Sequence, residues 1–214
     1  FVSKKFNTHH EVKLGAIYNH KSFDLIDSVF EKDNNRFFTM RNFDGALQTI
    51  QPYTQWRYKL SDNLVMNTGL HYLLNTYNST YSIEPRWGMC WSFAPTQSLS
   101  LGYGRHSQLA PVTIYFYQVM QPDSINYYTP NKNLEMTHAH HFVLGYDWNI
   151  NEYTRIKSEI YYQMLKNVPV DKVEATSYSM LNEGAGFYID APDFLTNSGT
   201  GENYGIELTL ERFL

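Results

Sequence analysis

The sequence contains a single cysteine, Cys90, and no excess of basic residues. One cysteine excludes an internal disulfide framework. The 17 lysine and arginine residues are outnumbered by 21 aspartate and glutamate residues, which argues against a nucleic-acid partner. No apolar run approaches the roughly 20 residues that a membrane helix needs, so any membrane crossing would use strands. The opening residues, FVSKKFNTHH, lack the regions of a signal peptide, which leaves either a mature chain or a piece of a longer protein.

Tyrosine and phenylalanine, by contrast, are abundant, with 18 and 13 copies in a chain whose mean hydropathy is −0.46. In residues 51–74, QPYTQWRYKLSDNLVMNTGLHYLL, apolar and polar side chains alternate on both sides of Ser61-Asp62-Asn63. Alternation with a period of two predicts strands, and the turn between them predicts a hairpin. The same pattern recurs and predicts eight strands, at about residues 10–20, 51–60, 64–74, 81–93, 99–104, 140–148, 155–162 and 204–211.

The predicted connections alternate between short and long, apart from one short outer link, NTYNSTY at residues 75–81. The tight turns lie at residues 61–63, 94–97 and 149–152. The long polar segments lie at residues 21–46, 107–137 and 166–203. Transmembrane barrels have this asymmetry, with short periplasmic turns and long extracellular loops. In a compact soluble domain, structureless loops longer than about 15 residues are uncommon. The pattern therefore predicts that the long segments lie outside the cell.

The two faces of the predicted strands differ in composition. Glu84, Arg86 and Gly88 share one face, and rings such as Trp91 and Trp148 lie near the tight turns on the other. A polar face rich in small residues suits a hydrated lumen, and aromatic rings near strand ends suit a bilayer interface. The sequence thus predicts an all-β fold, an antiparallel transmembrane β-barrel segment whose apolar faces contact lipid. The alternative is a soluble β-sandwich with the aromatic face as its core.

Three phrases of the sequence resemble one known family. The stretch NSGTGENYGIELTLERFL, residues 197–214, resembles a late barrel strand of TonB-dependent receptors, particularly the large receptors of Bacteroidota. The stretch HFVLGYDWNINEYTRIKSEIYYQMLKNVPV, residues 141–170, is similar to the preceding hairpin in that family. GRHSQLAPVTIYF, residues 104–116, resembles the exit from a strand into an extracellular loop. These phrases identify the barrel and leave the cargo open.

This resemblance implies a place and a role for the chain. Such receptors combine a plug domain with a barrel of 22 strands. Nothing in the sequence resembles the plug, so residues 1–214 are expected to be part of a barrel domain. The implied location is the bacterial outer membrane, and the implied activity is import of a glycan, peptide, metal chelate or vitamin with energy coupled from the inner membrane. Implied partners are outer-membrane lipid, the plug domain of the same parent chain and TonB, with a surface lipoprotein left open.

Two other classes of function remain open at this point. The first is a non-transporting outer-membrane surface module, or a small barrel that closes on itself, since eight strands can close a barrel. The second is a soluble β-sandwich that binds carbohydrate. The sequence shows no nucleophile elbow or ordered triad, so we expect no enzyme, no catalytic residue and no cofactor.

Candidate binding residues are few. His138 and His140 fall on one strand face, but a transition-metal site needs a third ligand and the sequence identifies none, so no metal site is assigned. The long loops are the expected recognition surface, because loops on a rigid scaffold carry binding residues. Aromatic side chains with amide and carboxylate neighbours suit sugars, peptides or aromatic chelators. The loop residues predicted to contact cargo are Tyr115, Tyr117, Tyr127, Tyr128, Tyr178, Phe187 and Tyr188.

Overall fold

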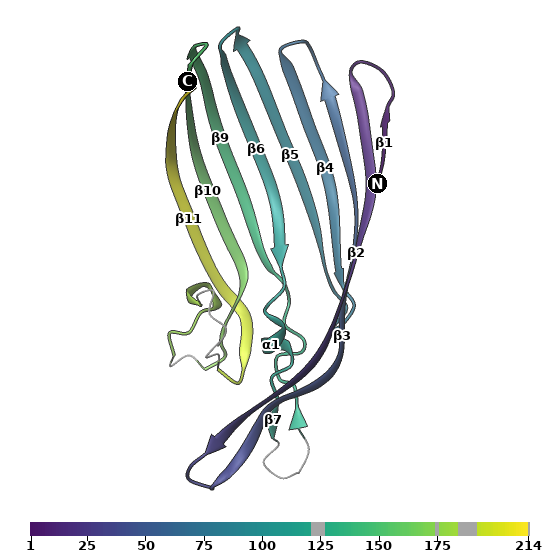
Figure 1. Ribbon diagram of the computed structural model, residues 1–214, viewed down its shortest axis with the longest axis vertical. Helices are drawn as coiled ribbons and strands as arrows, with labels where there is room; N and C mark the ends of the chain where they lie inside the picture. The colour runs from purple at the N-terminus through teal and green to yellow at the C-terminus, as the bar shows by residue number, and fades with distance from the viewer. Residues whose placement is uncertain (121–126, 174–175, 184–191, 214) are drawn as a thin grey trace.

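The computed structural model describes residues 1–120, 127–173, 176–183 and 192–213, which form one curved antiparallel sheet (Figure 1). Its nine strands lie side by side in chain order. They are β1 Val2–Lys5, β2 His10–Glu31, β3 Arg36–Lys59, β4 Leu64–Asn75, β5 Thr80–Ala94, β6 Gln97–Gln108, β9 Thr137–Asn151, β10 Thr154–Asp171 and β11 Leu195–Arg212. The eight predicted strands are confirmed, and β1 is an addition that its short, polar sequence did not indicate.

The remaining elements are small and lie in the long connections. They are the helix α1 Val112–Tyr115, the two-residue strands β7 Val119–Met120 and β8 Tyr127–Tyr128, and the 3-10 turn η1 Met180–Asn182. Among the described residues, no helix is long and apolar enough to cross a membrane. The fold is therefore almost entirely β, as the sequence predicts.

One predicted loop is in fact a hairpin. Residues 21–46 were expected to be a long polar loop, but they form the distal halves of β2 and β3, joined by a turn at 32–35. Pairing continues from His10↔Tyr58 to Glu31↔Arg36, with a register shift between Asp27 and Ser28. The prediction was wrong because it ended the strands where apolar alternation ends. Ladder hydrogen bonds need no apolar face, so a polar sequence can continue the strands.

Strand register confirms the predicted assignment of faces. One continuous row of directly paired residues crosses the sheet through Val12, Trp56, Thr68, Trp87, Tyr103, Phe142, Tyr162 and Tyr204. Since neighbouring side chains on a strand point to opposite faces, a shift of one residue would have moved a whole strand's apolar set to the other face. The apolar faces of β2–β6 and β9–β11 are therefore one surface.

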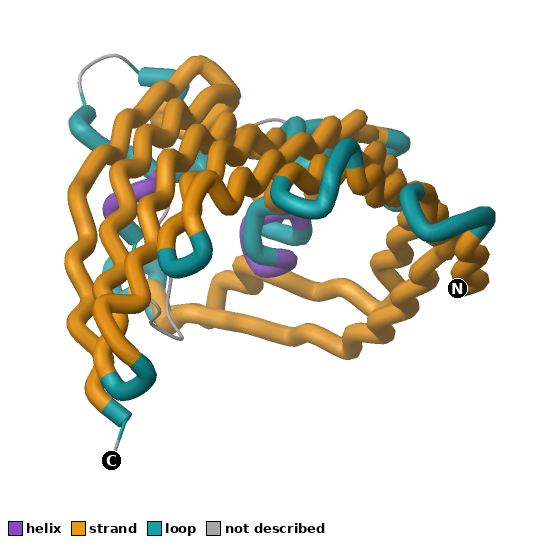
Figure 2. Tube along the Cα trace, turned by 90° about the horizontal axis from the view of Figure 1, so that it is seen from above, coloured by secondary structure: helices purple, strands orange, loops and turns teal. Residues whose placement is uncertain are grey.

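The sheet curves around its polar face. Viewed from above, the strands form an arc, and α1 lies on the concave side (Figure 2). Phe23 of β2, which shares a face with Glu11 and Lys13, contacts Phe116 at the end of α1, so this face is the concave one. Within the described part of the chain, β1 and β11 are the edges of the sheet and do not pair with each other. A two-sheet sandwich is excluded, because the only other sheet among the described residues has two strands, β7 and β8.

The three predicted tight turns lie at one end of the sheet, and the long connections lie at the other end together with the short turn between β4 and β5 (Figure 1). The tight turns lie between β3 and β4, β5 and β6, and β9 and β10. The three predicted tight turns and the long connections β6–β9 and β10–β11 are confirmed, and the one short link at the opposite end, between β4 and β5, is also present. The long connections and the distal β2–β3 hairpin pack together at the far end, and we call this assembly the roof.

Candidate functional site

Polar side chains on the concave face line a hollow of about 860 Å³. Its polar lining comes from five adjacent strands, β2 to β6, and includes Lys13, Arg57, His71, Glu84 and Arg86. These residues share a face because the strands pair in register, with His71 directly opposite Glu84. A concave wall of this kind can bind a polar ligand or a polar protein segment.

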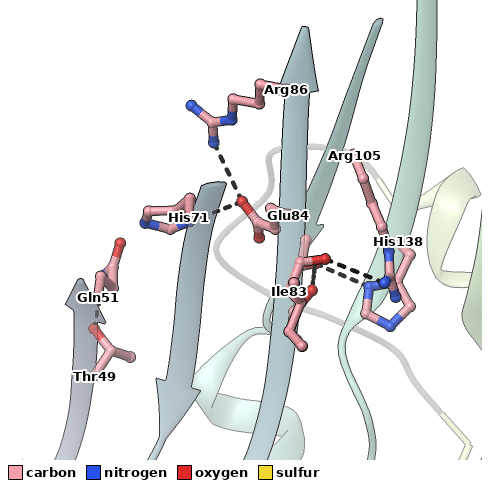
Figure 3. A network of polar contacts seen from close by, with 10 residues as sticks. Thr49, Gln51, His71, Ile83, Glu84, Arg86, Arg105 and His138 are labelled. Atoms are coloured by element: carbon pink, nitrogen blue, oxygen red, sulfur yellow. Dashed lines mark hydrogen bonds and ion pairs between the residues drawn. The ribbon is translucent and has the colours of Figure 1, made fainter. Parts of the chain in front are cut away.

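Glu84 is the most deeply buried charged side chain of this wall, with 2% of its surface exposed. Its Oε2 atom accepts from His71 Nδ1 at 2.9 Å and from an Arg86 guanidinium nitrogen at 3.2 Å (Figure 3). Its Oε1 atom is buried and has no hydrogen-bond partner among the described residues. A buried carboxylate oxygen without a donor is costly. The wall thus offers an acceptor to whatever fills the hollow.

A second charged group lies near the tight turns, on β9, β10 and β11. Arg155 Nε donates to Asp147 Oδ1 at 2.6 Å, and the same guanidinium lies 3.8 Å from Glu211. Lys157 Nζ donates to the other Glu211 oxygen at 2.9 Å. These groups are about one-third exposed, so solvent weakens each pair. The predicted polar face is therefore a wall of paired charges.

Two tyrosines lie flat against this wall. Tyr53 covers Gly15, its direct partner across β2 and β3, and Tyr161 covers Gly205 across β10 and β11. A Cβ atom on Gly15 would lie 2.5 Å from the Tyr53 ring. Glycine at these positions lets each ring fold onto the sheet instead of projecting into the concave space.

The roof has the only sizeable apolar core among the described residues, a cluster centred on Ile114, Tyr115 and Phe116. Each of these three side chains is at most 1% exposed. Phe43 of the β2–β3 hairpin stacks on Phe116 with ring centroids 3.5 Å apart, and Tyr77 meets Phe116 edge-on. Burial raises the pKa of the Tyr115 hydroxyl above its usual value. The hairpin, α1 and the β4–β5 turn are thereby held together.

Asparagine side chains tie the roof segments to one another. Asn131 is 1% exposed, accepts from the backbone N–H of Leu195 at 3.0 Å and donates to the carbonyl of Asp193 at 3.2 Å. Asn78 donates to the carbonyls of Lys132 and Leu134, both at 3.0 Å. Sequence reasoning missed these residues. Their positions beside turns suggest side-chain bonds to the backbone, but not which distant segment supplies the partner.

Three of the seven predicted cargo residues lie inside or against the roof. Tyr115 is fully buried. Tyr117 is half-buried, and its hydroxyl donates to Asp193 Oδ1 at 2.6 Å. Tyr178 is half-buried and packs against the roof core. In this conformation these side chains support the roof, and their contact with cargo stays a prediction.

The other four lie at the roof surface or beyond the described residues. Tyr127 is 44% exposed, and Tyr128 is half-buried next to Phe194. Phe187 and Tyr188 lie outside the described ranges. Tyr127 is therefore the most accessible of the predicted cargo residues that the structure places.

His138 and His140 share the convex face of β9, as predicted, and each has a protein partner. His138 Nδ1 lies 2.9 Å from Ser107 Oγ, and His140 Nδ1 lies 3.0 Å from the Tyr103 hydroxyl. In the part of the chain that the structure describes, no three histidine, cysteine or acidic side chains form a group that could hold a metal ion.

Comparison with known proteins gives one family. The model of the family described as TonB dependent receptor-like, beta-barrel, matches residues 1–213. No curated protein matches the sequence. The fold is similar to the FrpB iron transporter from Neisseria meningitidis, with a TM-score of 0.62, 14% identity, and coverage of 99% of this chain and 33% of that one.

Two further solved structures show the same likeness. The siderophore receptor PirA from Pseudomonas aeruginosa has a TM-score of 0.63 at 12% identity, covering 93% of this chain and 35% of that one. The copper transporter OprC has a TM-score of 0.60 at 10% identity, covering 99% and 33%. The chain thus spans about a third of the length of the structures it resembles.

Proposed function

Because the chain belongs to the TonB-dependent receptor β-barrel family, we propose that it is one part of the barrel of an outer-membrane transporter that imports a nutrient with energy coupled from the inner membrane. The remaining strands would complete the barrel by pairing with the edges at β1 and β11. The proposed role is binding and passage of cargo, without catalysis.

The observation that carries this proposal is the convex apolar surface. Leu208 is 76% exposed, Ile206 is 74% exposed and Ile160 is 50% exposed, and all lie on the same face of adjacent strands. Soluble monomers rarely expose a contiguous apolar surface that extends across several strands in this way. Lipid contact removes it from water, and strands satisfy every backbone hydrogen bond within the sheet.

The concave wall supports the second half of the proposal, which is a filled lumen. Glu84, His71 and Arg86 present polar and charged groups to the inside of the arc, and the Glu84 Oε1 atom has no hydrogen-bond donor among the described residues. A polar plug domain from the same parent chain would supply such donors, and contact with TonB would run through that domain. A surface lipoprotein partner and the Bacteroidota type belong to the same proposal, on the strength of the sequence phrases alone.

The roof is the proposed site of cargo recognition. It joins aromatic rings with amide and carboxylate groups, as in Tyr127 and the Tyr117–Asp193 pair. That chemistry suits a glycan, a peptide, a metal chelate or a vitamin. The similar structures are named for iron, a siderophore and copper, and at 10–14% identity their likeness concerns the fold.

Cysteine labelling in the complete receptor tests the placement. In a Cys90→Ser background, Ser198→Cys at the roof end of β11 should react with an impermeant thiol reagent on intact cells. Asn63→Cys and Thr96→Cys, in the tight turns, should react only after the outer membrane is permeabilised. All three positions are exposed, so access through the membrane alone decides the result. The reverse pattern would overturn the proposal.

An uptake screen tests transport itself. Cells lacking the receptor, cells with the receptor restored and cells lacking TonB would be offered labelled oligosaccharides, peptides, ferric chelates and vitamins. We expect one class to enter only when the receptor and TonB are both present. Uptake that does not need TonB would contradict energy coupling and favour a passive pore.

A further inference from the structure

The convex face changes character abruptly at its roof end. On β9 the outward apolar residues run from Ile150 back to Phe142, a distance that matches the roughly 9–11 residues of a membrane-spanning strand. The next two outward residues are His140 and His138. On β10 the outward residues from Ile156 to Met164 are followed by Lys166. Basic side chains thus begin where the apolar span ends.

Strand register brings these basic side chains together. Arg105 of β6 pairs with His140 of β9, and Lys166 of β10 pairs with His138. The four residues form one cluster on three adjacent strands, which we call the basic cluster. The nearest acidic residue at this level is Glu135, whose Oε2 atom already accepts from Asn167 at 2.9 Å. Lys166 is exposed, so the cluster is open to the surroundings.

A gap in the sheet adjoins the cluster. Pairing between β5 and β6 stops at Arg86↔Gly104, although β5 stays paired with β4 as far as Thr80. The next residue of β5 is Pro85, which has no N–H to donate. Arg105 takes over by donating to the carbonyl of Ile83 at 3.2 Å. The proline thus explains why the strands separate on the roof side of this point.

The gap contains a hollow of about 420 Å³. Arg105 and His138 both line it and lie next to each other (Figure 3). The Nε atom of Arg105 is buried and has no hydrogen-bond partner among the residues described. Tyr81 and Ile83, both largely exposed on the convex side, form its apolar rim. Glu135 also lines the hollow, and its Oε2 atom already accepts a hydrogen bond from Asn167. The Arg105 donor that lacks an acceptor, beside His138 and the apolar rim, fits an anion carried on an apolar body.

We propose that the basic cluster and the adjoining gap bind the phosphate of an anionic lipid headgroup in the outer leaflet. Arginine and lysine are the usual phosphate partners, and Arg105 has a donor to spare. The acyl chains would lie along Tyr103, Phe142 and Tyr162, the aromatic row directly below the cluster. The site rests on the membrane placement of the proposed function, with the roof outside the cell, and it assigns a lipid partner that is not the cargo.

The test uses the complete receptor in nanodiscs of zwitterionic lipid, titrated with fluorescent lipid A as the phosphate-bearing lipid. Lys166→Gln removes one exposed charge without touching the fold. The matched control is Lys4→Gln, a basic residue on the same convex face but in β1, toward the tight turns. Loss of one cation near an anionic lipid surface corresponds to about 1 kcal/mol, so Lys166→Gln should weaken binding roughly fivefold. Lys4→Gln should leave it unchanged.

Two further arms decide the source of the phosphate and separate this site from transport. Inorganic phosphate in millimolar excess should not displace lipid A, because it lacks the apolar body. Cargo uptake by the Lys166→Gln receptor should stay normal, so failure of the lipid site and failure of transport are distinct outcomes. Equal weakening by both substitutions, unchanged binding in Lys166→Gln, or displacement by inorganic phosphate would each overturn the proposal.

Discussion

The sheet exposes apolar side chains on its outer face, whereas the roof buries them in a core. On the convex face of β2, Leu14 and Tyr18 are 56% and 60% exposed. Further along the same strand, Phe23 and Leu25 turn to the concave side and pack on the roof core. The first arrangement is stable only against lipid, and the second is the ordinary arrangement of a protein in water. A single pair of strands therefore crosses from one solvent to the other.

The largest expected effect comes from emptying the roof core. Phe116→Ala should destabilise the roof by about 3–5 kcal/mol, because a buried phenylalanine is replaced by a cavity. Hydrogen exchange of residues 109–120 should then speed up while the strands below keep their protection. The control is Phe37→Ala in the same assembly, since Phe37 is 72% exposed. Collapse of the whole barrel in Phe116→Ala would show that roof and sheet are one cooperative unit.

The next effect comes from putting a charge on the convex face. Leu208→Arg should cost about 2–4 kcal/mol in folding titrations into lipid vesicles if the residue lies near the bilayer midplane. The neighbouring Glu207→Gln should cost far less or stabilise slightly, because Glu207 lies opposite Glu159 on the concave side. Equal losses from the two substitutions would contradict the assignment of faces.

A smaller effect is expected from cutting one tether of the roof. Asn131→Ala leaves the N–H of Leu195 and the carbonyl of Asp193 without their partner and should cost about 1–3 kcal/mol. Limited proteolysis should detect faster cleavage at the start of β11 with the sheet intact. Asn203→Ala is the matched control, because Asn203 is exposed on β11 and makes one bond, to Gln163.

The smallest expected effect is a pH dependence at the roof end of β10. Hydrogen bonds from the Thr176 hydroxyl and the backbone N–H of Val173 lower the pKa of Asp171 below its ordinary value of 3.8. The native state therefore favours the carboxylate, and its contribution is complete above that value and is lost as the pH falls through the lowered pKa. The protection factor of the Val173 amide, which corrects for the intrinsic pH dependence of exchange, should fall in acid, and Asp171→Asn should abolish this change. Unaltered acid sensitivity in that variant would assign the effect elsewhere.

The same comparison explains what the sequence could and could not predict. The strands near the tight turns were predictable because lipid on one side forces the period-2 pattern that Trp87 and Arg86 follow. The distal hairpin at 21–46 alternates less regularly, so the sequence predicted a loop there. The roof core depends on contacts between distant segments, such as Phe43 with Phe116. The sequence shows that the long segments are rich in aromatic residues. Only the fold shows that one of these residues, Tyr115, is fully buried.

The chain order of the strands has a consequence for how the protein assembles. Each strand of the large sheet pairs with the strands of that sheet that come before and after it in the chain, and most of the ladders close over short turns. Short closures are fast, because little chain entropy is lost before pairing begins. The pairing of β6 with β9 differs, because residues 109–136 separate them, and the 172–194 connection between β10 and β11 is also long. The described parts of both segments belong to the roof. We therefore expect the sheet to form first, as successive hairpins, and the roof to pack last over a nearly complete barrel.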